Sequence, residues 1–311
     1  MNFQEALQNH DIEALRAVPK TDLHNHGLMG GRLSVMEELI GKPIGKFEYG
    51  HEGIPGINRW IGTCYAPLFK NPGTFEHAVS AAFIQAKADG VSILEMSVDV
   101  SCGVLFNISP SKMVSLLDQT HKTLAPEIDF RPELGFARVR PVRTLLRWFE
   151  PLLDTGYFKS VDLYDDEAAQ PVRNFRELYR FVRNSGLKCK AHAGEFGTAE
   201  SVRESVEELG LEAVQHGIGA ADSPEVMKWL AMNNIQLNVC PSSNIILKRI
   251  ESYPVHPIRI LYDHGVRVTL NTDDVMLFDA GNSEQYLELY KCGLFSPAEL
   301  DEIRLNGLQP L

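Results

Sequence analysis

The sequence predicts an α/β protein folded as a (β/α)8 barrel, or TIM barrel, and three observations support this. Short apolar runs alternate with amphipathic stretches from about residue 20 onward, giving eight strand-helix alternations. Polar residues gather where the apolar runs end, as they do at the carboxyl-terminal rim of such barrels. The chain has 311 residues and 44% hydrophobic content, which is ample for a barrel of about 250 residues. We therefore expect one barrel domain over residues 1–311.

The N-terminal part contains a predicted helix, a strand and a long irregular segment. Residues 3–18 are expected to form one N-terminal helix within 1–19, because Leu7, Ile12 and Leu15 are spaced for burial and Pro19 ends the pattern. A strand at 20–26 and a helix at 33–40 follow. Residues 41–73 are rich in Gly and Pro, and an irregular stretch of this length is usually functional or mobile. We interpret 41–73 as a lid insertion over a pocket, with an ordinary surface excursion as the alternative.

The rest of the chain alternates regularly between strands and helices. A doubly wound open sheet is the alternative architecture, but it would not bring the first and last strands together. Further strands are expected at 91–98, 131–138, 158–163, 187–192, 213–216, 235–239 and 266–270. Further helices are expected at 75–89, 111–124, 142–153, 175–185, 199–209, 224–233 and 257–264.

Composition argues against several functional classes. The net charge of −11 does not suit a nucleic-acid surface, where basic clusters supply most of the affinity. No segment reaches the roughly 18 apolar residues of a membrane span, and the N-terminus lacks the layout of a signal peptide. The five cysteines include no C-x-x-C pair and are odd in number, which is typical of a reduced protein. We expect a cytoplasmic protein without nucleic-acid or membrane partners; the sequence does not specify its oligomeric state.

Histidines and aspartates stand at the ends of several predicted strands. Side chains alternate along a strand, so His24 and His26 should point the same way, although a polar loop with two incidental histidines is possible. His192, His216 and Asp273 end three later strands. Imidazoles and a carboxylate suit a borderline cation such as zinc; iron or manganese could also occupy such a site. The chemistry requires the first and last strands to be neighbours.

The stretch K-A-H-A-G-E at 190–195 is the centre of the predicted site. His192 ends a strand, Gly194 permits a bend, and Glu195 can face back toward whatever His192 holds. A metal ligand beside a proton-transferring carboxylate is what metal-assisted hydrolysis needs. Taken singly, each residue is better explained as a core histidine, a strand cap or a turn residue; taken together they favour a metal site.

An ordered set of motifs resembles the adenosine deaminase branch of the amidohydrolase superfamily. The resemblance extends from about residue 20 to about residue 290. Its motifs are D-L-H-N-H at 22–26, H-A-G-E at 192–195, Q-H-G at 215–217, C-P-S-S-N at 240–244, H-P-I at 256–258 and L-N-T-D-D at 270–274.

The resemblance implies an amidohydrolase-like barrel and a role for each matching residue. His24, His26, His192 and Asp273 would hold one Zn2+ ion per chain. Glu195 would protonate the purine ring nitrogen, and His216 would orient the attacking water, take its proton and stabilise the developing charge. Asp274 would bind a second ring position or align the nucleophile, and Gly194 would let the backbone approach the base.

Two departures from the family pattern bear on the substrate. The family usually reads H-x-H-L-D-G after the first strand, whereas Leu28 or Met29 stands here in place of the aspartate that reaches ribose. The family usually reads D-L-x-G-D-E after the fourth strand, and Asp165 replaces that glycine. We expect Met29 and Asp165 to shape substrate binding.

The sequence supports three hypotheses of function. The first is a zinc-dependent hydrolytic deaminase of a 6-aminopurine nucleoside, releasing ammonia from this small-molecule partner. The second is the same chemistry on adenine, an N6-substituted adenine or another amino-heterocycle. The third is a non-catalytic relative that binds a nucleoside or a protein, which is disfavoured because no catalytic position is lost.

Overall fold

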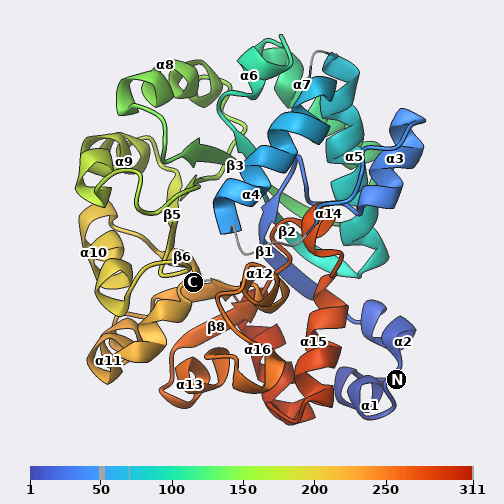
Figure 1. The fold of residues 1–311 in the computed structure, drawn as a ribbon, viewed down its shortest axis with the longest axis vertical. Coiled ribbons are helices and arrows are strands. Elements are labelled where there is room, and N and C mark those ends of the chain that lie inside the picture. Colours follow the sequence, from blue (N-terminus) through green and yellow to red (C-terminus); the bar gives the residue numbers. More distant parts are fainter. Residues whose placement is uncertain (49–52, 70, 310–311) are drawn as a thin grey trace.

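Eight parallel strands form a barrel in the order in which they occur in the chain. The structure is a computed structural model, and it describes residues 1–48, 53–69 and 71–309. Each strand pairs with the next one along the chain (Figure 1). The strands are β1 (Lys20–His26), β2 (Val91–Asp99), β3 (Asp129–Ala137), β4 (Ser160–Tyr164), β5 (Lys188–Ala193), β6 (Ala213–His216), β7 (Gln236–Val239) and β8 (Arg267–Leu270).

The first and last strands meet just beyond the end of β8, which confirms the closed barrel. The backbone N–H of Asp273 donates to the carbonyl of His24 over 2.9 Å, and Asn25 and Asp273 form a parallel bridge. An open doubly wound sheet is therefore excluded.

Side chains complete the seam between β1 and β8. The backbone N–H of Leu23 donates to Oδ1 of Asn271 over 2.7 Å. The buried amide of Asn282 donates to the carbonyls of Thr21 and Leu270, at 2.7 and 2.9 Å, and so joins the two strands directly. The barrel thus closes through side-chain amides as much as through a backbone ladder.

Helices cover the outside of the barrel (Figure 1). The predicted helices at 33–40, 142–153 and 199–209 are confirmed with these bounds. The α-helices are α1 (Phe3–Gln8), α2 (Ile12–Arg16), α3 (Leu33–Ile40), α4 (Gly53–Trp60), α5 (Pro72–Ala88), α6 (Cys102–Leu105), α7 (Pro110–Leu124), α8 (Val142–Leu153), α9 (Arg176–Asn184), α10 (Ala199–Leu209), α11 (Pro224–Met232), α12 (Pro241–Ile246), α13 (Ile258–Asp263), α14 (Val275–Phe278), α15 (Asn282–Lys291) and α16 (Pro297–Leu308). A π-helix spans Ile61–Tyr65, and 3-10 turns span Ala66–Leu68, Val172–Phe175, Ile218–Asp222 and Tyr253–Val255.

The prediction of one helix over 3–18 is wrong, because the chain forms α1 and α2 with a break between them. His10 adopts a left-handed φ of 52°, which no α-helix continues through. Asp11 then caps α2 by accepting a hydrogen bond from the backbone N–H of Ala14. The apolar residues keep helical spacing across the break at His10, so the sequence pattern did not reveal Asp11 as the N-cap of a second helix.

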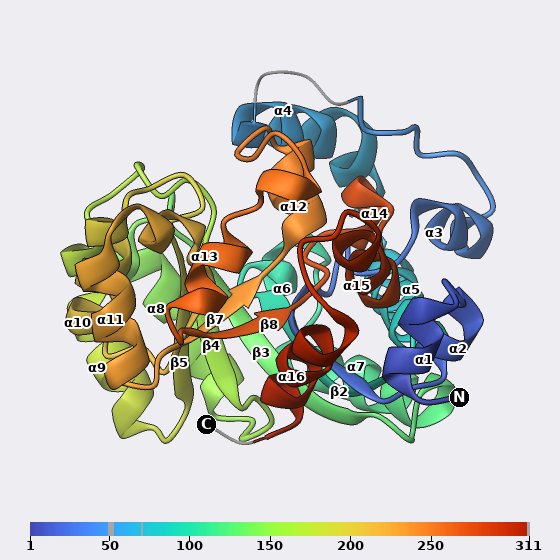
Figure 2. The ribbon, with the colours of Figure 1, turned by 90° about the horizontal axis from the view of Figure 1, so that it is seen from below.

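The segment at 41–73 is largely helical where it is described, so its predicted irregularity is wrong. It contains α4, the π-helix and a 3-10 turn, while residues 49–52 and 70 lie outside the described part. Figure 2 shows α4 beyond the barrel strands, at the same end of the molecule as α12 and α14. Its proposed role as a lid is considered below.

The barrel and its helices share one apolar core, and α16 covers the seam. A Cβ on Gly307 of α16 would lie 2.0 Å from Oγ1 of Thr21, so only glycine permits this close packing. All five cysteines are free thiols. Among the described residues, no helix has the length and apolar character needed to cross a membrane.

Candidate active site

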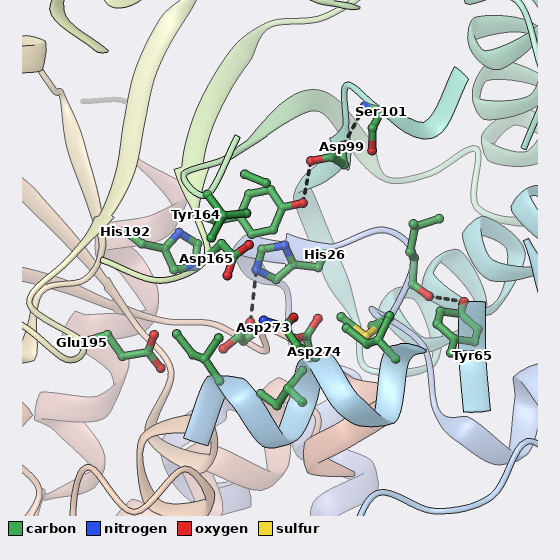
Figure 3. Close-up of a pocket in the computed structure, with 18 of the residues that line it drawn as sticks. His26, Tyr65, Asp99, Ser101, Tyr164, Asp165, His192, Glu195, Asp273 and Asp274 are labelled. Atoms are coloured by element: carbon green, nitrogen blue, oxygen red, sulfur yellow. Dashed lines mark hydrogen bonds and ion pairs between the residues drawn. The ribbon is translucent and has the colours of Figure 1, made fainter. Parts of the chain in front are cut away.

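A cavity of about 300 Å³ lies at the carboxyl-terminal end of the barrel (Figure 3). This is the rim where barrels of this kind carry their sites, because the loops that follow the strands converge there. Strand ends and the residues just after them contribute His26, Asp99, Ala137, Tyr164, His192, His216, Asp273 and Asp274 to its lining.

The structure brings the four predicted metal ligands together. Oδ1 of Asp273 lies 3.5 Å from Nε2 of His24 and 3.3 Å from Nε2 of His26. The ring of His192 is 4.6 Å from that of His24, between centroids. His24 and Asp273 are 249 positions apart in the sequence, and their side chains nevertheless converge on the same place.

These side chains suit a cation. Both ring nitrogens of His24 are buried without a hydrogen-bond partner, and such atoms need a proton, a water or an ion. Ligand atoms of His24, His26 and Asp273 lie within 4.8 Å of one another, as do those of His24, His192 and His216. A divalent ion with nitrogen and oxygen ligands fits this donor set.

The carboxylate of Asp162 lies behind His192. Nδ1 of His192 is 3.1 Å from Oδ2 and 3.3 Å from Oδ1 of Asp162. An ionised carboxylate only accepts, so Nδ1 carries the proton and Nε2 keeps its lone pair for a ligand. Although burial alone would raise it, the neighbouring His192 holds the pKa of Asp162 down at about 2.

Glu195 is suited to donate a proton. The carboxyl of Glu195 is buried, and its Oε2 lies 3.6 Å from Nε2 of His216. Its Oε1 has no hydrogen-bond partner. Burial raises the pKa of Glu195 well above its ordinary value, and the charge of Asp273 adds to the effect. The neutral acid form is the one that can protonate a substrate nitrogen.

The turn that carries Glu195 is fixed by Glu167, which sequence reasoning did not assign. Its carboxylate accepts the backbone N–H groups of Gly194, Glu195 and Phe196 at 2.8, 2.9 and 2.9 Å. The Nε of Arg249 donates to the carbonyl of Glu195 over 2.9 Å. The Glu195 turn is thereby held from both sides. Asp162 lies in β4 and Glu167 just after it, both within the stretch D-L-Y-D-D-E at 162–167 that the family resemblance singled out, which was the available signal.

Strained backbone marks the site. His216, Asp273 and Asp165 all have left-handed φ angles, of 62°, 62° and 81°. Non-glycine residues rarely adopt this conformation, and those that do gather at functional sites. Asp274 follows directly, with its Oδ1 buried and unpaired. Burial raises the pKa of Asp274 to about 7, although the neighbouring His26 lowers it.

Of the predicted substrate-binding residues, some line the cavity and one does not. Met29 and Asp165 both line the cavity, and the side chain of Asp165 interacts with Asn58 of α4. Gly194 is not among the described lining residues. Glycine is required there because φ is +68° and a Cβ would lie 2.3 Å from the side chain of Val202.

The cavity has a polar side and an apolar side. On the polar side, the hydroxyl of Tyr164 donates to Asp99 over 2.5 Å, close to Ser101 and Asp165 (Figure 3). Apolar side chains from the segments after β1 and β8 and from the α4 region form the other side; they are Leu28, Met29, Ile54, Ile57, Ile61, Phe69 and Phe278. The sequence pattern predicted that residues 41–73 lie over a pocket but did not reveal the helix α4 and its lining residues, because the amphipathic pattern of this helix is short and interrupted by Gly and Pro.

The chain is similar to known deaminases in sequence. The family profile described as adenosine deaminase matches residues 68–310. A protein of Treponema pallidum named putative adenosine/adenine deaminase is 33% identical over 285 residues, covering 92% of this chain and 95% of that protein. An adenosine deaminase of Shewanella loihica is 36% identical over 150 residues, and the match spans only 45% of its length.

Solved structures share the fold. An adenine deaminase from Arthrobacter aurescens superposes with a TM-score of 0.82 at 22% identity, covering 94% of this chain and 92% of that one. An amidohydrolase from Burkholderia ambifaria with bound Zn gives a TM-score of 0.82 at 23% identity, covering 94% and 85%. With the profile match and the full-length relative, the chain belongs to the adenosine deaminase family of the amidohydrolase superfamily and is a hydrolytic deaminase.

Proposed function

We propose that this deaminase is metal-dependent and releases ammonia from a 6-aminopurine base or nucleoside that carries no phosphate. The observation that carries the proposal is the cluster of His24, His26, His192 and Asp273, of which the last three line the cavity together with Glu195. The names of the Treponema and Arthrobacter proteins, which specify adenosine or adenine, support this substrate class.

In this proposal, His24, His26, His192 and Asp273 hold a single zinc ion. When bound, zinc supplies a nucleophile from water at neutral pH. The carboxyl of Glu195 protonates the ring nitrogen next to the amine-bearing carbon, so the ring can accept electrons as the nucleophile adds. The carboxylate of Asp274 would bind a second polar position of the ring. Of the two protons of the attacking water, one would end on the amino group, which leaves as ammonia, and the other would restore the proton that Glu195 gives to the ring nitrogen.

The charge of the cavity disfavours a phosphorylated substrate. The carboxyl groups of Asp99, Asp165, Asp273 and Asp274 line it, whereas Arg140 is the only lysine or arginine among its described lining residues. A nucleoside monophosphate would bring two negative charges into this field. The apolar side chains of α4 instead suit the faces of a purine and an uncharged substituent.

An ammonia-release assay tests this function. The zinc-loaded enzyme is offered adenosine, 2′-deoxyadenosine, adenine and adenosine 5′-monophosphate, and turnover of N6-methyladenine is followed separately by the methylamine that it would release. We expect turnover of at least one uncharged aminopurine and a lower kcat/KM for the monophosphate. A zinc-loaded enzyme that releases no ammonia from any of these compounds contradicts the proposal.

Asp165 favours a second candidate within the same chemistry, an amino-heterocycle with extra hydrogen-bond donors. Its carboxylate stands where the family pattern described above has glycine, and it points into the cavity beside Tyr164 (Figure 3). The variant Asp165→Gly should relieve the left-handed strain, stabilising the fold by about 1 kcal/mol. It should also raise KM for the true substrate while leaving KM for plain adenosine or adenine unchanged. An unchanged KM for every substrate turned over would reject a recognition role for Asp165.

We also propose that α4 and the helical turns after it act as a lid. Ile54, Ile57 and Ile61 line the cavity that the strand ends open into. Opening this segment would expose the apolar side chains and admit substrate, and closing it would exclude water from the reacting atoms.

A further inference from the structure

A row of hydrogen bonds runs away from the cavity behind His216. The backbone N–H of Ile258 donates to Nδ1 of His256 over 3.2 Å. A backbone N–H can only donate, so Nδ1 of His256 accepts and the proton of this neutral ring is on Nε2. That Nε2 lies 3.3 Å from Oδ1 of Asn244, and Nδ2 of Asn244 lies 3.2 Å from Nδ1 of His216.

The donor and acceptor roles along this row are set by His256, the residue farthest from the cavity. His216, Asn244 and His256 are all buried, with at most 1% of each exposed. Burial lowers the pKa of His256 to about 3, so its ring is neutral at pH 7. Turning the Asn244 amide over would set its N–H groups against the N–H of His256. Buried N–H groups without a hydrogen-bond partner are unfavourable, so the amide keeps the orientation described above.

We propose that His256 and Asn244 are positioning residues, which keep the proton of His216 on Nε2. His216 is then a hydrogen-bond donor toward the reacting atoms and is not a metal ligand. The catalytic consequence of this inference rests on the proposed function, whereas the position of the proton follows from the hydrogen-bond geometry. It replaces the proton-accepting role that the family resemblance implies for His216.

The contrast with His192 supports this assignment. A carboxylate, that of Asp162, lies behind Nδ1 of His192, so Nε2 of that ring keeps its lone pair. An amide N–H lies behind Nδ1 of His216, so Nε2 of this ring carries hydrogen. Nε2 of His216 is buried and unpaired, 3.6 Å from Glu195 and 3.8 Å from Asp273. The partner of Nδ1 thus determines the role of each ring: His192 can bind a metal through Nε2, and His216 donates a hydrogen bond from Nε2.

Nitrogen-15 NMR of the zinc-loaded wild-type enzyme tests the proton position directly. The signals of His216 are identified by their loss in the variant His216→Asn. We expect a protonated, pyrrole-like Nε2 and an unprotonated Nδ1. A protonated Nδ1, or an Nε2 shifted by bound metal, overturns the proposal. Because no substrate is used, this result is independent of whether any purine is deaminated.

Paired variants test the positioning role. His256→Leu removes the donor to Asn244, while His256→Gln keeps an amide N–H at that place. Asn244→Asp puts a carboxylate behind His216 and should move the proton to Nδ1. We expect His256→Leu and Asn244→Asp to lower kcat by about 10²–10⁴-fold at unchanged zinc content, with His256→Gln restoring most of the loss. Equal losses in His256→Leu and His256→Gln, or an unmoved proton in Asn244→Asp, would show only a structural role.

Discussion

At the scale of single residues, the proposed chemistry depends on carboxyl groups whose surroundings differ. Glu195 is buried with one oxygen unpaired, and its raised pKa favours the neutral form. The variant Glu195→Gln keeps the shape but removes the transferable proton. We expect kcat to fall by about 10²–10⁴-fold, with zinc content measured by mass spectrometry unchanged. The exposed matched variant Glu177→Gln should retain full activity. Normal turnover by Glu195→Gln would reject Glu195 as the proton donor.

The two histidines of β1 differ in charge in the metal-free protein. Burial lowers the pKa of His24 to about 4, so this ring is neutral at pH 7. Burial also opposes a charge on His26, but the carboxylates of Asp274 and Asp273 outweigh it and raise the pKa of His26 to about 10. A metal binds only neutral imidazole, so His26 must lose its proton on binding.

Zinc affinity should therefore rise with pH. Below this raised pKa, each unit of pH multiplies the neutral fraction of His26 by about ten, and the zinc affinity rises in proportion. We expect about one proton to be released at pH 7, measured by calorimetry in two buffers of different ionisation enthalpy. The variant His26→Asn should release none from this position. Zinc uptake by the wild type without proton release would contradict a charged His26.

At the scale of secondary-structure elements, the proposed lid can be tested by hydrogen exchange. The helix α4 places Ile54 and Ile57 on the cavity and lies beyond the ends of the strands (Figure 2). If it closes over a bound molecule, its amides should exchange more slowly with saturating inosine or hypoxanthine present. Helix α9, on the outer surface of the barrel, serves as the control and should not change. Equal exchange of α4 with and without the bound product would argue against a lid.

At the scale of the whole molecule, stability depends on the seam where the barrel closes. The Asn282 amide joins Thr21 of β1 to Leu270 of β8 from a fully buried position. Asn282→Ala leaves both carbonyls unpaired, and we expect a loss of about 2–5 kcal/mol in the free energy of unfolding, measured with urea. Asn233→Ala, which removes an exposed bond within one helix end, should change it by less than about 1 kcal/mol. Equal effects would mean that the seam does not control stability.

Sequence patterns predicted much of the architecture, because strands and helices leave local periodicities. β1 and β6 were expected with their observed bounds, as were α3, α8 and α10. The break at His10 and the helical content of α4 were missed, since a capping residue and a Gly-rich short helix are weak local signals. The single-domain organisation and the roles of the site residues remain predictions.

The sequence by itself determined the barrel and the family and predicted the candidate residues of a metal site, because strand-helix alternation and the order of motifs can be read along the chain. Only the tertiary structure decided what stands behind each of those residues. The residues behind His192 and His216 and under the Glu195 turn come from separate segments of the chain: Asp162 from β4, Glu167 from the loop after it, Asn244 from α12 and His256 from the turn before α13. Hydrogen-bond direction is set by such contacts between distant segments, and a linear sequence does not record them.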